Sequence, residues 1–461
     1  MMRGMQPEPS AADERGVIVG EGSGISAPPV AAEMGAVLSA EAAQAPRPAP
    51  VEAVRRWPPP ALAVRPFRWY WGAQWPVFLG TWMQVVALGY YVYQQTHSTT
   101  AVGAVAAADG LPAVVLSLFG GVLADRMPRR RILLFTQSTL GISAGVLAIL
   151  VATHHASLAA VMLVAVVFGS ADSLDLPTRQ ALVADLVDRE RVVNAVALTS
   201  VAMSLTRIAG PSIAGLLIGA AGPAICFAAL SLAYIAPITV LATIVPNIPP
   251  RRREGRHTAR GDFVEGLREL RRNPLVLRLT VCAAALSFFG VSYMPYLPVY
   301  AHDRLHAGSQ VLGLLYTTGG VGALVGSVFL ATMGGSVRTR RLMLLAGAFI
   351  YAGSLFSLAS SSTLAVAIPA LVGISLGFLG MNTSMTTLLQ TETDPALRGR
   401  LLGIYVTIFA GLQPMGTLVY GLFGHSVFRA ISIGAVVVGV AGVYTALSSP
   451  LRQGGEAASS R

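Results

Sequence analysis

The sequence predicts an all-α membrane protein with twelve transmembrane helices in two six-helix halves. The chain of 461 residues is 54% hydrophobic and only 12% charged, about half the charge of a typical soluble protein. Its apolar segments are long enough to cross a hydrocarbon layer about 30 Å thick, which needs roughly 20 residues per helix. Arginines gather between alternate segments, as they do in the cytoplasmic loops of membrane proteins.

The predicted spans follow one another with short connections, so consecutive helices run in opposite directions. Their approximate extents are 70–94, 101–124, 131–153, 157–178, 194–219, 222–245, 276–301, 309–333, 340–360, 362–388, 400–424 and 427–448. The domains expected from them are a cytoplasmic arm (1–66), a first bundle (67–245), a cytoplasmic linker (246–275), a second bundle (276–450) and a tail (451–461). The arm is rich in Ala, Pro, Gly and Glu, so we expect it to be disordered.

The arginines predict the orientation. All 33 basic residues are arginine, which is typical of a GC-rich bacterial genome. If both termini are cytoplasmic, 30 of the 33 lie in the arm, the cytoplasmic loops or the tail, as the positive-inside rule requires. We therefore expect a multi-pass protein of the bacterial inner or plasma membrane. Because the arginines are dispersed between apolar spans, we expect no nucleic-acid partner.

The two halves carry related sequences. The loop RMPRRRILLF at 126–135 matches SVRTRRLMLL at 336–345, and the later loops LVDRERVVNAVAL and TETDPALRGRLLGI also correspond. Six spans, a basic loop and six more spans therefore indicate parallel half-repeats. This is the plan of a secondary transporter whose substrate site lies near the bilayer midplane.

Four stretches occur in an order that resembles a known family: TWMQVVALGYYVYQ, GGVLADR, LPTRQALVADLVDRERVVNAVAL and RIAGPSIAGLL. Over residues 67–450 the chain resembles the major facilitator superfamily, and within it the exporters of drugs and siderophores. The resemblance implies proton-coupled efflux of a drug-like, siderophore or natural-product molecule by alternating access. An importer, a facilitator or a lysophospholipid flippase on the same fold is the alternative.

The sequence contains no HExxH and no nucleotide-binding loop, so we expect neither an enzyme nor a bound cofactor or metal. The expected partners are a small-molecule substrate, the proton and the lipid bilayer. We expect a monomer to be the functional unit.

A cluster of charged residues follows the second span. The superfamily pattern Gly-x-Leu-Ala-Asp-Arg-x-Gly-Arg-Arg falls on it, with Pro128 in place of one glycine. One interpretation is that the loop only sets topology. The other is that Asp125 bonds to the start of span eleven and ties the two halves together, since a helix N-terminus attracts a carboxylate. The residues of this predicted gate are Gly121, Asp125, Arg126, Arg129, Arg130, Arg398 and Arg400.

Three ionisable residues lie inside spans, where charge is costly and indicates function. Asp109 lies roughly 12 Å below the outer face and Arg207 roughly 20 Å from the inner face, at 1.5 Å per helical residue. Asp172 lies near the cytoplasmic end of span four, at helical spacing from Asp175 and Arg179. Asp109, Asp172 and Arg207 are the candidates for proton coupling. Asp109 could instead face a wet vestibule, and Arg207 could bind a carboxylate, a substrate or the carbonyls at a helix end.

Two further sets complete the expected site. Gly210, Pro211 and Gly215 resemble the antiporter pattern Gly-Pro-x-x-Gly-Gly, with Ala214 replacing one glycine. Small residues there would let spans five and eight approach closely, and in exporters of this superfamily such packing is thought to limit proton leak. The candidates for the substrate pocket, of which the two tyrosines could instead be packing residues, are Gln84, Tyr293, Tyr296, Asn382 and Gln413.

The orientation can be tested directly. A reporter enzyme fused at residue 260 should be active on the cytoplasmic side, because the arginine distribution requires the linker to lie there. Activity of the reporter on the outside of the cell would contradict the predicted topology.

Overall fold

The computed structural model describes residues 59–248, 270, 272–332, 337–393 and 395–448. Within these ranges it leaves out the side chains of 113–115, 117–126, 331, 332, 395–397, 399 and 400. By its contacts the chain divides into two units, residues 1–55 and 56–461, and only the second is described. The first 58 residues of the expected arm, most of the expected linker and the expected tail lie outside the described residues.

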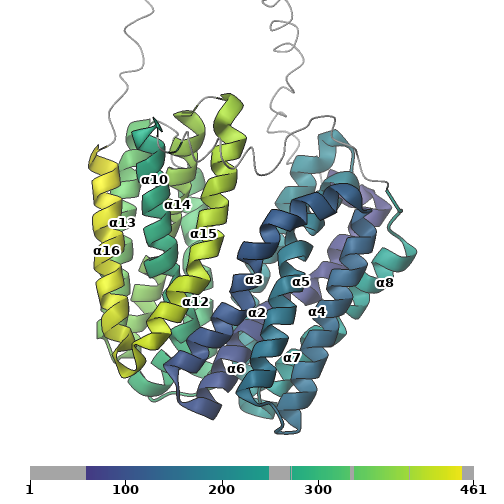
Figure 1. Ribbon diagram of the computed structural model, residues 1–461, viewed down its shortest axis with the longest axis horizontal. Helices are drawn as coiled ribbons and strands as arrows, with labels where there is room; N and C mark the ends of the chain where they lie inside the picture. The colour runs from purple at the N-terminus through teal and green to yellow at the C-terminus, as the bar shows by residue number, and fades with distance from the viewer. Residues whose placement is uncertain (1–58, 249–269, 271, 333–336, 394, 449–461) are drawn as a thin grey trace, which may run out of the picture. The chain divides into compact units, whose positions relative to one another are not determined.

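Long α-helices make up most of the described chain (Figure 1). The first half contains α2 (Arg65–Thr96), α3 (Thr99–Arg126), α4 (Arg129–Ala152), α5 (Leu158–Asp185), α6 (Val192–Ala221), α7 (Ala224–Ala233) and α8 (Ile235–Thr243). The second half contains α10 (Pro274–Ala285), α11 (Leu297–Val299), α12 (Ser309–Thr332), α13 (Val337–Ser360), α14 (Leu364–Thr391), α15 (Pro395–Leu422) and α16 (Val427–Ser448).

The number of spans agrees with the prediction. Among the described residues, 10 helices are long and apolar enough to cross a membrane, with α7 and α8 forming one span and 274–304 another. The helices α2 and α3, with 32 and 28 residues, complete the predicted set. The all-α, twelve-helix fold class is therefore confirmed.

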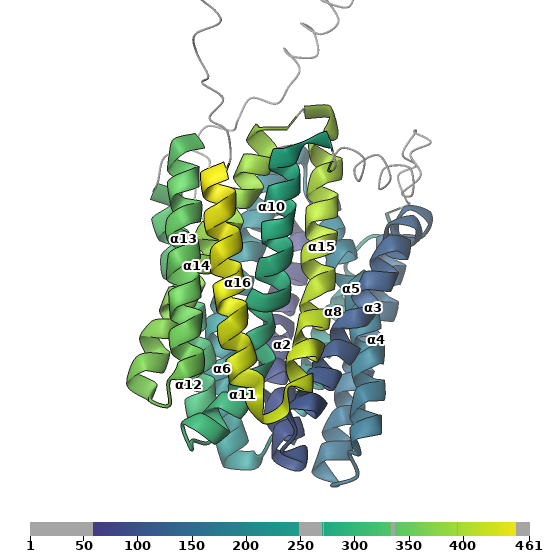
Figure 2. The same cartoon turned by 60° about the vertical axis from the view of Figure 1, so that its left-hand side comes forward.

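The helices of each half pack in the same pattern (Figure 2). The first span contacts the fifth and sixth, which are α6 and α7 around α2, and α15 and α16 around α10. The second span contacts the fourth: α3 packs on α5, and α12 packs on α14. The third span lies against the fourth and sixth, so α4 contacts α5 and α7 while α13 contacts α14 and α16. The two halves, whose loops carry related sequences, therefore also pack their helices in the same way.

Apolar stripes cover the outer faces of the helices. Phe135, Ile142 and Ile149 are 69%, 66% and 64% exposed and lie seven residues apart, on one face of α4. Exposed apolar area on this scale would be costly in water but suits contact with lipid tails.

The start of the second half is fixed by a cap. The Asn273 side chain accepts hydrogen bonds from the backbone N–H groups of Leu275 and Val276, at 3.1 and 3.4 Å, and Pro274 occupies the first turn. Asparagine before proline is a favoured helix start, because the cap satisfies amides that have no partner within the helix.

The seventh span is irregular, and its prolines explain why. Between residues 286 and 304 it passes through π and 3-10 turns around Pro295 and Pro298. Pro298 has no N–H to donate to the carbonyl of Met294. The Tyr316 hydroxyl donates to that carbonyl instead, at 3.1 Å. A side chain from another helix thus satisfies a group that lipid could not.

The two halves meet along α3 with α15 and along α6 with α12. In the second pair the backbones themselves touch: a Cβ atom added to Gly313 would lie 2.7 Å from the Pro211 carbonyl oxygen and 3.1 Å from the Cα of Gly215. The predicted close approach of spans five and eight is therefore present at Pro211 and Gly215. Gly210 lies on another side of α6, against the Trp82 side chain of α2. The role of this motif in limiting proton leak stays a prediction.

The backbone contact can be tested by adding a side chain. Gly313→Val should lower the apparent melting temperature in detergent, because overpacking a tight contact costs ~1–3 kcal/mol. Gly353→Val is the matched control, since an added Cβ there meets no heavy atom within 4 Å. Equal melting temperatures for the two variants would contradict the tight packing.

Candidate functional site

A cavity lies between the two halves, from near the middle of the helices towards the turns at 97–98 and 423–426. It has a volume of about 380 Å³ and is lined by α2 and α3 of the first half and by α15, Met294, Pro295 and Tyr316 of the second. A second space of about 90 Å³ adjoins it, because Trp82, Met294 and Tyr316 line both. The walls are mostly apolar, as expected for the pocket of a bulky organic ligand.

The predicted site residues divide between these spaces. Asp109 and Gln413 line the larger cavity, and Arg207 and Tyr293 line the smaller one. Gln84 borders a small separate cavity of about 10 Å³, which Asp109 also borders. Asp109 therefore lies between the central cavity and a space the size of one water molecule.

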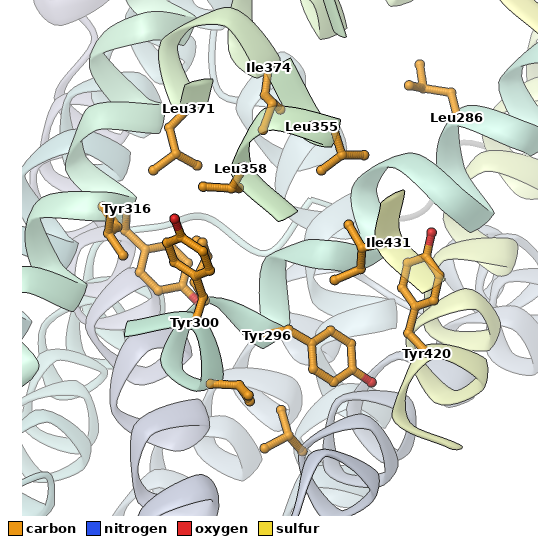
Figure 3. Packing of buried hydrophobic residues seen from close by; sticks show 14 of the residues in the cluster. Leu286, Tyr296, Tyr300, Tyr316, Leu355, Leu358, Leu371, Ile374, Tyr420 and Ile431 are labelled. Atoms are coloured by element: carbon orange, nitrogen blue, oxygen red, sulfur yellow. The ribbon is translucent and has the colours of Figure 1, made fainter. Parts of the chain in front are cut away.

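Two of the predicted pocket residues, Tyr296 and Asn382, line none of these three cavities. Tyr296 is 1% exposed, and its hydroxyl donates to the carbonyl of Thr417 at 2.5 Å. The Asn382 side-chain oxygen accepts a hydrogen bond from the Tyr405 hydroxyl at 2.8 Å. Both are packing contacts inside the second half, and Figure 3 shows Tyr296 among the buried apolar side chains of that half.

The two candidate acids lie side by side. A Cβ atom added to Gly169 would fall 1.7 Å from the carbonyl oxygen of Asp109, so α3 and α5 touch backbone to backbone there. Asp172 is three residues beyond Gly169, about one turn along α5. The two carboxyl groups are within electrostatic range of each other. Among the ion pairs of the described residues, none includes Asp109 or Asp172.

The helix that carries Asp172 is longer than predicted. It continues through Pro177 to Asp185, beyond the expected end at residue 178. Asp172 therefore lies at its middle and not near its cytoplasmic end. Side-chain bonds hold the added turns: Arg179 pairs with Asp175 one turn away, and Asp185 pairs with Arg129 of α4.

The Asp175–Arg179 pair is fully enclosed. Asp175 is 0% exposed, accepts a hydrogen bond from the Thr136 hydroxyl at 2.8 Å and another from the Arg179 Nε at 2.9 Å. The Arg179 guanidinium also lies 5.3 Å from the centroid of the Phe78 ring. A buried pair whose polar atoms are satisfied is a structural element, because breaking it would leave an isolated charge.

Arg207 lies at the middle of α6 and faces the cavity. Its guanidinium is 5.1 Å from the Trp82 ring centroid, and Tyr293 of the opposite half is within electrostatic range. No described acid pairs with it. The described residues therefore provide no carboxylate partner for Arg207. The charged group within electrostatic range of Asp109 is the Asp172 carboxylate and not Arg207.

Hydrogen bonds join the halves at one end of the helices. We call this the arginine-poor end; it carries the turns at 97–98, 153–157, 222–223, 305–308, 361–363 and 423–426. There the Tyr93 hydroxyl donates to Asp303 at 2.6 Å, and the Thr100 hydroxyl donates to the carbonyl of Gly421 at 2.8 Å. The Ser309 hydroxyl donates to the carbonyl of Gly215 at 3.1 Å. These bonds hold the arginine-poor end closed.

At the opposite, arginine-rich end the described gate residues bind within their own half. Arg129 donates to Asp185 and to the carbonyl of Ala181, and Arg130 donates to the carbonyls of Leu241 and Ala242. Arg398 is exposed. The side chains of four predicted gate residues are not described: Gly121, Asp125, Arg126 and Arg400. The predicted bond between Asp125 and the start of span eleven therefore stays a prediction.

Comparisons with known proteins agree on one family. The family described as Transmembrane secretion effector matches residues 56–461. The enterobactin exporter EntS of Escherichia coli O1:K1 / APEC is 30% identical over 383 residues, which is 79% of this chain and 89% of that protein. The protein of the same name from Shigella boydii serotype 18 has the same identity and coverage.

Solved structures show the same fold at low identity. The nucleoside transporter NupG, as a D323A mutant, superposes with a TM-score of 0.66 at 13% identity, over 83% of this chain and 98% of that one. A bacterial homolog of the human lysosomal transporter Spinster, solved inward-facing and unoccupied, gives a TM-score of 0.58 at 14% identity, over 83% and 94%.

The hydrogen bond between Tyr93 and Asp303 can be tested by removing the Tyr93 hydroxyl group. Tyr93→Phe removes the bond to Asp303 and should raise the population open at this end about fivefold. The estimate takes ~1 kcal/mol for a hydrogen bond to a carboxylate that is partly in water. Electron–electron distances between spin labels at His155 and Ser362, on exposed turns of opposite halves, would measure the change after Cys226 and Cys282 are replaced by alanine.

The control for this measurement is Tyr91→Phe, since the Tyr91 hydroxyl bonds to Ala156 within the first half. If both variants shift the distances equally, the Tyr93–Asp303 bond does not hold the end closed.

Proposed function

The chain belongs to the transmembrane secretion effector family of major facilitator transporters, and from this premise we propose that it is a proton-coupled exporter. It is a multi-pass inner-membrane transporter of a small molecule. The proposed substrate is bulky and amphipathic: a drug-like compound, a siderophore or another natural product. The proposed unit is a monomer working by alternating access, with no nucleic-acid partner.

The observation that carries the coupling proposal is the pair Asp109 and Asp172. Two carboxylates held together away from bulk water repel each other, and one bound proton removes the repulsion. Asp109 also borders the central cavity, so the opening of one or the other end of the cavity can change its access to protons. A site that holds the proton in one state and releases it in the other is the requirement for antiport.

The closed arginine-poor end supports a direction for the cycle. We propose that this end faces away from the cytoplasm and that both termini lie inside, as the arginines predict. Substrate would then enter the central cavity from the cytoplasm while the Tyr93–Asp303 bond holds the far end shut. Opening of that end would release substrate and admit the proton that drives the return.

The gate motif belongs to the same proposal. Arg129 and Arg130 bind partners in their own half. We therefore assign contact with the opposite half to Asp125. We propose that it meets the start of α15 near Arg398 when the arginine-rich end closes. A carboxylate at a helix N-terminus contributes about 0.3–2 kcal/mol, which biases a two-state transporter without locking it.

Import, facilitated diffusion or lipid flipping would use the same fold. The name of the relatives, enterobactin exporter, favours export and a siderophore-like substrate. Coupling to protons separates an antiporter from a facilitator.

Asp109→Asn should abolish enterobactin transport driven by a pH gradient while leaving substrate binding nearly unchanged. The amide resembles the protonated carboxyl group but has no proton to release. Uptake into inside-out vesicles with and without an imposed pH gradient would measure this, with protein abundance checked in each preparation.

Asp172→Asn is the matched comparison, one helix turn from the same contact. If it alone uncouples transport, the proton resides on α5. If neither change alters the dependence on the pH gradient, coupling through these acids is wrong and the facilitator alternative gains.

A further inference from the structure

Arg207 is a cation in the smaller space beside the central cavity, and no described acid forms an ion pair with it. It projects from the middle of α6, where snorkelling to either membrane surface is difficult. The Trp82 ring at 5.1 Å offers a cation–π contact, and the Arg207 side chain is otherwise exposed.

The opposite wall offers an unused hydroxyl. Tyr351 is 1% exposed, lines the same space as Arg207, and its hydroxyl has no hydrogen-bond partner among the described residues. A buried hydroxyl without a partner is unfavourable. Tyr293 connects the two groups, since it is within electrostatic range of both Arg207 and Tyr351. Tyr316 differs, because its hydroxyl already donates to Met294.

The rest of this space is apolar. Leu315, Leu371, Ile374 and Phe378 line it, and Figure 3 shows Leu371 and Ile374 in the same buried cluster as Tyr316. A ligand that fits must present an apolar body to these side chains and a hydrogen-bond acceptor to Arg207 and Tyr351. A neutral or cationic ligand would leave the guanidinium without a counter-charge.

We propose that Arg207 is the point at which the transported molecule is recognised, and that this molecule is an aromatic anion. Its carboxylate, sulfonate or phosphate accepts hydrogen bonds from Arg207 and the Tyr351 hydroxyl, and its ring lies against Trp82 and the apolar wall. The inference rests on the proposed transport function and adds the charge and shape of the substrate.

The test compares two probes that differ only in charge. Titration calorimetry on the full chain in lipid nanodiscs, without a pH gradient, measures binding of 2-naphthoate and of its neutral amide, 2-naphthamide. The wild type should bind the carboxylate about tenfold more tightly, since hydrogen bonds to charged groups are the strong ones.

Arg207→Gln should remove this preference and leave binding of the amide within about twofold, whereas Arg207→Lys should keep part of it. Tyr351→Phe should weaken naphthoate binding severalfold, because one donor is lost. Arg304→Gln is the matched control: Arg304 also lies over an aromatic ring, at 5.0 Å from Phe428, but not in this space. It should leave the preference intact.

Three results would overturn the proposal: equal binding of the two probes by wild type, an unchanged carboxylate preference in Arg207→Gln, or loss of the preference in Arg304→Gln as well. Binding of lysophosphatidylglycerol at Arg207 in place of naphthoate would replace the aromatic anion by a lipid and also overturn it. Failure of the exporter proposal is a separate result, since Asp109→Asn is scored by gradient-driven transport and these variants by equilibrium binding.

Discussion

Lipid tails cannot form hydrogen bonds, and the structure depends on this constraint throughout. It requires every backbone group of a span to find a partner inside the protein, which is why the described spans are helices. Where Pro298 removes a donor, a side chain from a neighbouring helix takes its place, as Tyr316 does at Met294. Tyr420 likewise donates to the carbonyl of Phe289, in the π segment of the same span, at 2.8 Å. These repairs surround the seventh span, which also borders the central cavity. The irregular backbone is therefore placed where protein, and not lipid, can satisfy it.

The same constraint separates the charges into two kinds. Asp175 and Arg179 satisfy each other and receive a further bond from Thr136, so they belong to the scaffold. Asp109, Asp172 and Arg207 have no such partners among the described residues, and two of them border the central spaces. Unpaired charge at this depth is maintained at a cost in free energy. That cost is the physical argument for assigning these residues to transport.

The spans were predictable because hydropathy is a local property of the sequence, and eleven-residue stretches such as LAAVMLVAVVF at the start of α5 already show it. Partnerships between helices are not local. Nothing in the sequence indicates that Asp109 meets Asp172, although the glycine at 169 that permits the contact is visible once α3 and α5 are known to touch. The pair of Arg129 and Asp185 could not be predicted for the same reason, since the two residues are 56 positions apart in the sequence. Tyr296 was included among pocket residues by its type and its span, but only the packing of α15 against it reveals that its hydroxyl is already used.

The glycine contact between α6 and α12 has a mechanical consequence. Gly215 and Gly313 bring main chain against main chain, with no side chain between them that would have to change rotamer as the halves tilt. Such a contact can act as the pivot about which the two halves tilt, because the glycine surfaces can turn against each other without a change in side-chain packing. The Ser212 and Thr317 hydroxyls, 2.6 Å apart, add a polar bond inside the same interface. Gly215 and Gly313 lie closer to the arginine-poor ends of their helices than to the other ends, so a given tilt about this contact displaces the arginine-rich end further than the end that the Tyr93–Asp303 bond closes.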